Sequence, residues 1–236
     1  MKNFAFVSIG NDSHKNAKLL VKSIKKTNLN CRIIQISRKE DKVIIGVDEI
    51  LTFNFDSSVF MLNRLESQIK IIEKYGPTIF LDTDMLINKD LNEVFSLLKK
   101  NDFIFTNRKN NHYMNDTFSN IKYPEFTNKT TNDVMPFNGG FVGSSNAISM
   151  EKLLEIFLGL PQRFHYWFGD QVAQKKIFDT NEFRILVLDS KYNYMIENVT
   201  EFNQKIYVYH FKGKYKEFME PFYQKFSRYF GAGEGI

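Results

Sequence analysis

The sequence contains a single cysteine, Cys31, so no disulfide bond can form within one chain. Such chains are typical of reducing compartments, and we expect a cytoplasmic location. No segment approaches the roughly 20 consecutive apolar residues that a membrane-spanning helix needs, and Met1–Val7 lacks the long apolar region of a signal peptide. There is no arginine-rich block and no nucleic-acid-binding motif, so we expect no nucleic acid partner.

The residues that are abundant favour a packed domain. Hydrophobic residues make up 43% of the 236 residues and aromatic residues 15%, which excludes a disordered chain. This length suits one large α/β domain or two small ones, and because no linker is evident we expect one. The net charge of +5 favours anionic partners such as nucleotides, phosphates or an acidic membrane surface.

Strand and helix patterns alternate along the chain. Apolar runs predict strands at 4–9, 31–36, 43–47, 50–53, 79–87, 103–106, 185–188 and 206–211. Helical spacing predicts helices at 61–75, 91–98, 149–159, 169–178 and 221–230. It also predicts a first helix, which follows a turn at 10–13, is capped by Ser13 and ends near Lys26. This order predicts an α/β fold with a Rossmann-like, mainly parallel central sheet and helices on both faces.

Two carboxylates, Asp82 and Asp84, interrupt the apolar run 79–87. An ionised carboxylate in a buried strand costs several kcal/mol unless something offsets its desolvation. The two aspartates share strand parity, so in an extended strand both side chains point to one side. Paired oxygen ligands suit a divalent cation, which can in turn hold a diphosphate. The alternative is a strand end at which both acids are hydrated.

Three further clusters have both an ordinary and a chemical interpretation. The glycines of 138–140 allow close backbone approach, although a bulge or tight turn also explains them. The segment 168–171 places an acid and an amide at a helix start, where a capping aspartate is common. The segment 210–216 offers an imidazole, a glycine and several lysines after a strand, although a single histidine there is more often packed or exposed than a ligand.

Together these clusters predict a metal site. The two aspartates and His210 would make three ligands for Mn²⁺ or Mg²⁺, with positions left for diphosphate oxygens. Lys214 or Lys216 could place an ammonium against the same phosphates. Gly213 would let the backbone fold over them.

The order of these motifs resembles the metal-dependent glycosyltransferases of family 8, which include glycogenin and bacterial lipopolysaccharide galactosyltransferases. The resemblance extends from Phe4 to about Lys216. The matching motifs are Arg64-Leu65, Asp82-Thr83-Asp84, Asn138-Gly139-Gly140, Asp170-Gln171 and the pattern His210-X-X-Gly213-X-X-Lys216. Family members often follow the closing lysine with Pro-Trp, whereas this chain has Glu217-Phe218.

The resemblance implies a GT-A fold for residues 1–216 and transfer of a hexose from a nucleotide sugar, expected to be UDP-linked, to a saccharide or lipid-linked acceptor, with retention of configuration. The resemblance implies that Asp82, Asp84 and His210 bind Mn²⁺, with Mg²⁺ as the alternative, and that Asp82 also contacts the ribose. It implies that Lys216 and Gly213 contact the diphosphate, that Arg64, Asn138 and Gly139 contact the donor, and that Asn11 or Asp12 contacts the base. It places Asp170 and Gln171 beside the reacting anomeric carbon, as the catalytic pair.

Other activities remain open at this stage. A hydrophobic run before Asp-X-Asp also begins haloacid-dehalogenase phosphatases, although Leu86 stands where they have threonine or valine. A sugar nucleotidyltransferase shares the GT-A core but usually has a glycine-rich phosphate loop after its first strand. A non-catalytic relative that only binds a nucleotide is the third alternative.

Two segments have separate expectations. The polar segment 107–135 is expected to be a long loop that shapes substrate choice. Residues 217–236 are expected to form a C-terminal aromatic helix and tail on the same domain, because Phe218, Phe222, Phe226 and Phe230 recur every fourth residue. The alternative is that this basic, aromatic helix contacts the inner face of a membrane or forms a homodimer.

Overall fold

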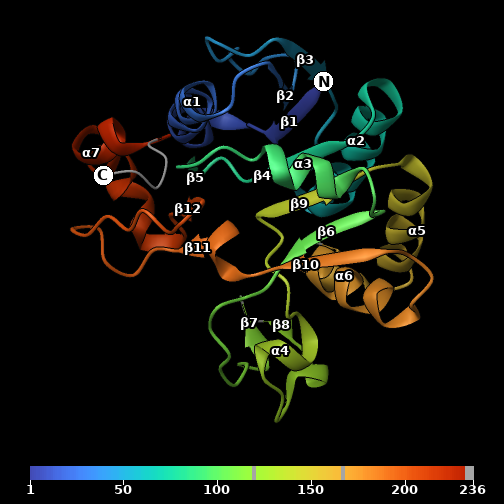
Figure 1. Ribbon diagram of the computed structural model, residues 1–236. Helices are drawn as coiled ribbons and strands as arrows, with labels where there is room; N and C mark the ends of the chain where they lie inside the picture. Colours follow the sequence, from blue (N-terminus) through green and yellow to red (C-terminus); the bar gives the residue numbers. More distant parts are fainter. Residues whose placement is uncertain (119–120, 166–167, 232–236) are drawn as a thin grey trace.

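The computed structural model describes residues 1–118, 121–165 and 168–231. The main sheet consists of β1 (Lys2–Val7), β2 (Cys31–Ser37), β3 (Glu49–Thr52), β4 (Thr78–Leu81), β6 (Phe103–Thr106), β9 (Phe141–Ser144) and β10 (Ile185–Leu188). These seven strands lie in the order β10-β6-β9-β4-β1-β2-β3 (Figure 1). All neighbours are parallel except β9, which is antiparallel to both β4 and β6. The predicted α/β fold with a mainly parallel sheet is confirmed.

Helices cover both faces of this sheet. They are α1 (Gly10–Thr27), α2 (Phe60–Tyr75), α3 (Asn92–Leu98), α5 (Ala147–Leu158) and α6 (Gly169–Thr180). Along β1, Phe4 and Phe6 pack with α1 and α3, whereas Ala5 between them packs with α2, α5 and α6. This alternation follows from the two-residue period of a strand. Since α1 and α2 lie on opposite faces, the carboxyl ends of β1 and β4 form a crevice, the usual ligand position in such sheets.

The run 79–87 is two strands rather than the single strand predicted. After β4 the chain turns at Asp82–Asp84 and continues as β5 (Met85–Ile87), which belongs to a second sheet with β12 (Val208–His210) and β11 (Tyr194–Met195). The change of sheet is fixed by the backbone: Asp82 N–H donates to Gly140 O (2.8 Å) and Phe211 N–H donates to Asp84 O (2.8 Å). Strand parity therefore does not explain why the two aspartates lie together.

Two other local predictions are wrong. No turn occupies 10–13, because α1 begins at Gly10, which has a φ of +74° and donates its N–H to Asp41 Oδ1 (3.0 Å). No strand forms at 43–47. Gln35 instead hydrogen-bonds to Ile44 N and Lys42 O, and this holds the segment as a loop that buries Ile44 alone.

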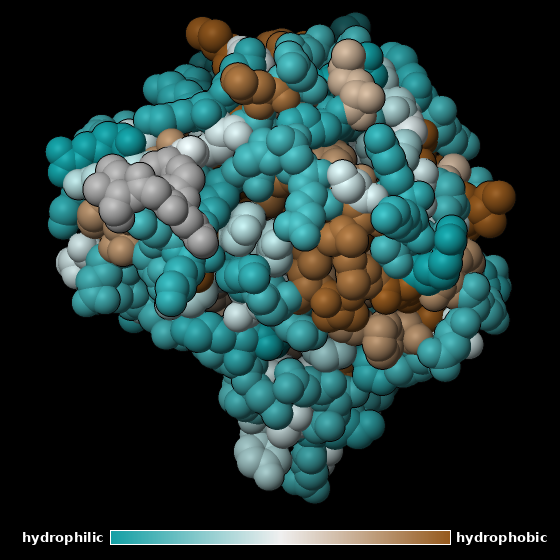
Figure 2. Space-filling model, viewed as in Figure 1, coloured by the Kyte–Doolittle hydropathy of each residue, from teal (hydrophilic) through white to brown (hydrophobic). Residues whose placement is uncertain are grey.

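The polar segment 107–135 is not a structureless loop. It contains an antiparallel pair of short strands, β7 (Thr117–Phe118) and β8 (Ile121–Lys122), and the short helix α4 (Thr131–Val134), which project below the main sheet in Figure 1. The surface over β6 and β10 carries the largest group of hydrophobic residues on the face drawn in Figure 2.

The C-terminal helix α7 (Met219–Phe226) lies beside α1 (Figure 1). Phe222, Phe226 and Phe230 are buried around Phe202, whereas Phe218 is 38% exposed. Most of the predicted aromatic stripe thus packs inside the molecule. Among the described residues, no helix is both long and apolar enough to cross a membrane.

Candidate metal and nucleotide site

Asp82, Asp84 and His210 converge at the junction of the two sheets. His210 is the last residue of β12 and lies opposite Met85 in the antiparallel pair with β5, so this register carries its ring beside the preceding turn. Its Nε2 atom is 3.3 Å from Asp84 Oδ1 and 3.9 Å from Asp82 Oδ2. One ligand atom from each of the three side chains lies within 4.8 Å of the others, and together they form a group that resembles an Asp-X-Asp metal site.

Asn193 holds the imidazole of His210 in position. Its amide nitrogen donates to Thr106 Oγ1 (2.9 Å) and to Asn138 O (3.1 Å), which leaves Oδ1 to face His210 Nδ1 at 2.9 Å. Because a carbonyl oxygen only accepts, Nδ1 carries the proton and Nε2 faces the carboxylates. Nε2 donates to Asp84 when it is protonated and presents a lone pair to a cation when it is not. Histidine ligands of metals commonly have such an outer partner.

The backbone beside this group leaves room only for glycine. A Cβ on Gly140 would lie 2.7 Å from His210 Cε1 and 3.0 Å from Asp82 Oδ2. A Cβ on Gly139 would lie 2.9 Å from Asp170 Oδ2. Two oxygen donors and one imidazole nitrogen, approached by backbone without side chains, fit Mn²⁺ or Mg²⁺.

Cationic side chains contact both aspartates. Arg64 on α2 donates from one nitrogen to Asp82 Oδ1 (2.9 Å) and to Gly139 O (2.9 Å). Lys216, on a 3₁₀ helix at Gly213–Phe218, places Nζ 3.0 Å from Asp84 Oδ2. Burial alone would raise the pKa of Asp84, but His210 and Lys216 hold this pKa well below its usual range.

The predicted catalytic pair lies across from the aspartates. Asp170 is buried in the first turn of α6, with Oδ2 3.8 Å from Arg64 Nη1. Burial raises the pKa of Asp170, and the nearby positive charge of Arg64 offsets only part of this rise. Gln171 accepts a hydrogen bond from Arg108, whose Nε donates to Met135 O (3.1 Å). The amide of Gln171 is therefore held by a side chain from the segment that follows β6.

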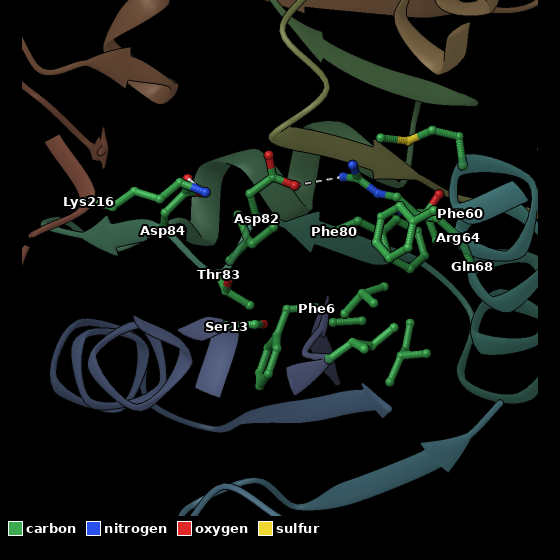
Figure 3. A pocket seen from close by; sticks show the side chains of 16 residues that line it. Phe6, Ser13, Phe60, Arg64, Gln68, Phe80, Asp82, Thr83, Asp84 and Lys216 are labelled. Carbon is green, nitrogen blue, oxygen red and sulfur yellow. Dashed lines mark hydrogen bonds and ion pairs between the residues drawn. The ribbon is translucent and has the colours of Figure 1, made fainter. Parts of the chain in front are cut away.

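Two cavities meet at the aspartates. The first, of about 260 Å³, lies at the carboxyl ends of β1, β2 and β4 and has largely apolar walls (Figure 3). The second, of about 250 Å³, reaches toward α6. Its lining includes Asn138, Gly139, Asp170, Gln171, Lys212 and Gly213. Both cavities are lined by Arg64, Asp82, Asp84 and Lys216, so these charged side chains lie where the two cavities adjoin.

Most of the residues singled out from the sequence lie at this junction, but Asn11, Asp12 and Lys214 do not. Lys214 is exposed, with its ammonium over the ring of Tyr215. Asn11 and Asp12 are exposed in the first turn of α1, and Asn11 borders a separate small cavity with Asp41. None of the three is part of the lining of the two cavities. The contact of Asn11 or Asp12 with a base stays a prediction.

Sequence reasoning missed three residues of the site. Asn193 and Arg108 belong to no motif, and only the folded chain shows their bonds to His210 and Gln171. Gln68 lies on α2 one helical turn after Arg64 and lines the first cavity. The spacing of four residues between Arg64 and Gln68 was the one available signal, because it puts both on the same helix face.

No protein-family model matches the chain, and no curated protein matches it in sequence. Its structure is similar to several glycosyltransferases. The galactosyltransferase LgtC, solved with donor and acceptor sugar analogs, matches with a TM-score of 0.57 and 11% identity over 93% of this chain and 95% of LgtC. The glycosyltransferase GlyE of Streptococcus pneumoniae matches with a TM-score of 0.58 and 13% identity, and the bifunctional glycosyltransferase WbbM with 0.55 and 14%.

The chain therefore has a GT-A-like glycosyltransferase fold. This confirms, at the level of the fold, the resemblance seen in the motifs. The chain covers 63% of GlyE and 51% of WbbM, so those two proteins contain parts that have no counterpart here. At identities of 11% to 14%, similarity in structure establishes the fold and leaves the reaction to be argued from the site.

Proposed function

We propose that this chain is a metal-dependent glycosyltransferase that moves a hexose from a UDP-linked sugar to a saccharide or lipid-linked acceptor, with retention of configuration. The observation that carries the proposal is the convergence of Asp82, Asp84 and His210 at the ligand-binding crevice of a glycosyltransferase fold. Two cations, Arg64 and Lys216, lie on either side of this group and would meet a diphosphate.

In this proposal Asp82, Asp84 and His210 hold Mn²⁺, or Mg²⁺ in its place. The ion would neutralise charge that develops on the departing diphosphate. Lys216 would place its ammonium against the same phosphates, and Gly213, with a φ of +62°, would allow the backbone to close over them.

The donor sugar would occupy the second cavity. Arg64, Asn138 and Gly139 would orient the sugar, and Asp170 and Gln171 would lie beside the anomeric carbon. Gln171 is held by Arg108, so its amide is positioned before a ligand binds. Such positioning favours transfer because less orientation is lost when the sugar arrives.

We further propose that residues 1–216 form the catalytic domain and that residues 217–236 belong to it. The burial of Phe222 and Phe226 supports this division. A cytoplasmic chain with basic residues beside α7 could approach lipid-linked acceptors at the inner face of a membrane, and exposed Phe218 with Lys225 would make that contact.

The main alternative with the same core is a sugar nucleotidyltransferase. Here α1 begins at Gly10, three residues after β1 ends at Val7, which leaves no room for the glycine-rich phosphate loop that such enzymes usually have. A haloacid-dehalogenase phosphatase is disfavoured because the fold is that of glycosyltransferases.

Calorimetry of Mn²⁺ and UDP binding tests the proposal. Asp84→Ala should abolish Mn²⁺-dependent UDP binding, whereas Glu201→Ala, which changes an exposed acid, should bind as the wild type does. Circular dichroism of both variants would verify the fold. Unchanged affinity in Asp84→Ala would show that the metal site is misassigned.

The donor and the stereochemistry have their own tests. Thermal-shift measurements with Mn²⁺ and a panel of nucleotide sugars identify the donor, because a ligand that binds only the folded state raises the melting temperature. NMR of the product anomer then distinguishes retention from inversion, and an inverted product would remove the proposed retaining mechanism.

A further inference from the structure

Two cations at the second cavity have no carboxylate in contact. Arg64 and Lys216 are each paired with an aspartate of the candidate metal site. Among the described residues, by contrast, no ion pair includes Arg108 or Lys212. Charged side chains that leave bulk water are usually paired in folded proteins. The unpaired charges of Arg108 and Lys212 therefore need an explanation of their own.

Arg108 is half-buried beside this cavity. Its Nε donates to Met135 O (3.1 Å) and a terminal nitrogen donates to Gln171 Oε1. Both acceptors are neutral, so they satisfy two N–H groups and leave the positive charge uncompensated. Burial lowers the pKa of Arg108, and Asp170 is the carboxylate that opposes this shift. Asp170, however, has its ion-pair contact with Arg64.

Lys212 lies on the wall of the same cavity, with part of its side chain exposed. It follows His210 by two residues, and both residues line the cavity together with Gln171. Partial burial and the positive charge of Arg108 lower the pKa of Lys212, so the two cations lie close enough to repel each other. An anion bound beside them would turn this repulsion into two favourable contacts.

The charges around the cavity also leave a surplus. Four cations line or border the cavity and face three carboxylates; they are Arg64, Arg108, Lys212 and Lys216 against Asp82, Asp84 and Asp170. A divalent ion and the diphosphate of a nucleotide sugar would cancel each other's charge and leave the surplus as it is. Because charges interact more strongly in a cavity that excludes water, the surplus favours one further anionic group.

We infer that Arg108 and Lys212 form an anion subsite, which binds a carboxylate or phosphate carried by a sugar in the second cavity. The inference deepens the proposed function and rests on it, because it takes this cavity to hold a sugar beside the diphosphate. A guanidinium has five N–H donors, of which Met135 and Gln171 occupy two. The donor sugar and the acceptor meet at the anomeric carbon, so either can carry the acid. The substrate class is thereby narrowed to acidic sugars.

Two calorimetric experiments test the subsite and separate the two sources of the acid. In the first, the Mn²⁺-loaded protein is titrated with UDP, UDP-glucose and UDP-glucuronate. In the second, the protein loaded with Mn²⁺ and UDP is titrated with glucose, glucuronate and glucose 6-phosphate. Both use the wild type, Lys212→Met and, as a matched control, Lys214→Met, which removes a neighbouring lysine that lines neither cavity.

We expect the wild type to bind the acidic ligand at least about tenfold more tightly than its neutral counterpart in one experiment, as for one charge-assisted hydrogen bond. A preference for UDP-glucuronate assigns the acid to the donor, and a preference for a free acidic sugar assigns it to the acceptor. Lys212→Met should lose the preference and keep its affinity for UDP within about twofold. Lys214→Met should keep both, and neither change should lower the melting temperature.

Other outcomes overturn the inference. Equal affinity for acidic and neutral ligands in both experiments would mean that no anion subsite exists. An equal loss for UDP and UDP-glucuronate in Lys212→Met would mean that Lys212 contacts the diphosphate. Loss of the preference in Lys214→Met as well would indicate general electrostatic attraction. UDP binding without any preference leaves the proposed function intact, whereas a wild type that binds no UDP with Mn²⁺ removes that function and the inference with it.

Discussion

His210 Nδ1 and Asn193 Oδ1 lie 2.9 Å apart in a region where both residues are buried. This contact should decide which ring nitrogen of His210 faces the aspartates. In Asn193→Ala we expect Mn²⁺ affinity to fall by about 10–100-fold, the usual effect of losing an outer partner of a metal ligand. Nitrogen-15 NMR of the metal-free protein checks the cause, since the wild type should show a protonated Nδ1 and the variant a mixture of forms. An unchanged ring signal with unchanged affinity would contradict this role.

Gly140→Ala should damage the site by crowding. Its new methyl group would lie 2.7 Å from His210 Cε1 and 2.8 Å from Met85 Cε, so the ring must move away from the aspartates. We expect about 1–3 kcal/mol of lost stability from overpacking and a large loss of Mn²⁺ affinity by calorimetry. Gly159→Ala is the matched control, because the methyl group there meets only ordinary contacts of 3.5 Å or more.

The two neighbouring lysines allow a sharp comparison. Lys216 Nζ is 3.0 Å from Asp84, whereas Lys214 contacts only the ring of Tyr215 among the described residues. Lys216→Met should weaken Mn²⁺-dependent UDP binding by about tenfold or more, as expected for a lost charge-assisted contact. Lys214→Met should leave that affinity within about twofold. Equal losses in the two variants would indicate general electrostatic attraction instead of a specific phosphate contact.

The aromatic residues around α7 should differ in their contribution to stability. Phe222 is 2% exposed and Phe218 is 38% exposed. Urea unfolding should therefore show a loss of about 3–5 kcal/mol for Phe222→Ala and a much smaller loss for Phe218→Ala. Vesicle flotation of the Phe218 variant tests the proposed membrane contact separately. Similar stability for the two variants would mean that α7 does not pack as described.

Asp41 should make stability depend on pH at the acidic end. Its hydrogen bond from the Arg38 guanidinium lowers the pKa of Asp41 to about 2, below the unfolded value of about 3.9. Because the pKa is lower in the folded state, the contribution of Asp41 to the free energy of unfolding is fully present above about pH 4. It is lost as the pH falls through about 2. The difference in unfolding free energy between the wild type and Asp41→Asn should follow this course. A difference that does not change with pH would exclude the ion pair as its source.

The fold was largely predictable because its signals are local and repeated. Strand segments such as 4–7 and 103–105 are continuous apolar runs, and α2 shows helical spacing over four turns. The errors arose where distant contacts decide the backbone. Gln35 prevents a strand at 43–47 through its side chain, and Asp41 fixes the start of α1 from 31 residues away.

The candidate site was predictable only in part. Residue types that commonly bind metals, and their order along the chain, could be recognised in the sequence. Asp82, Asp84 and His210 were therefore expected together. The geometry that joins them could not be foreseen, because it depends on β12 pairing with β5 in a second sheet. Asn193 and Gln68 lie outside every motif, since their roles depend on which side chains and cavities they face after folding.

The pairing of β12 with β5 also fixes when the site can exist. Two of the ligands lie in the first half of the chain, and the third follows Asp84 by more than half of the chain's length. A ribosome that has released only the amino-terminal half has therefore exposed Asp82 and Asp84 without His210. If the three residues bind a divalent ion as proposed, its tight capture must wait for β12 to dock on β5, so metal uptake would report when that pairing forms.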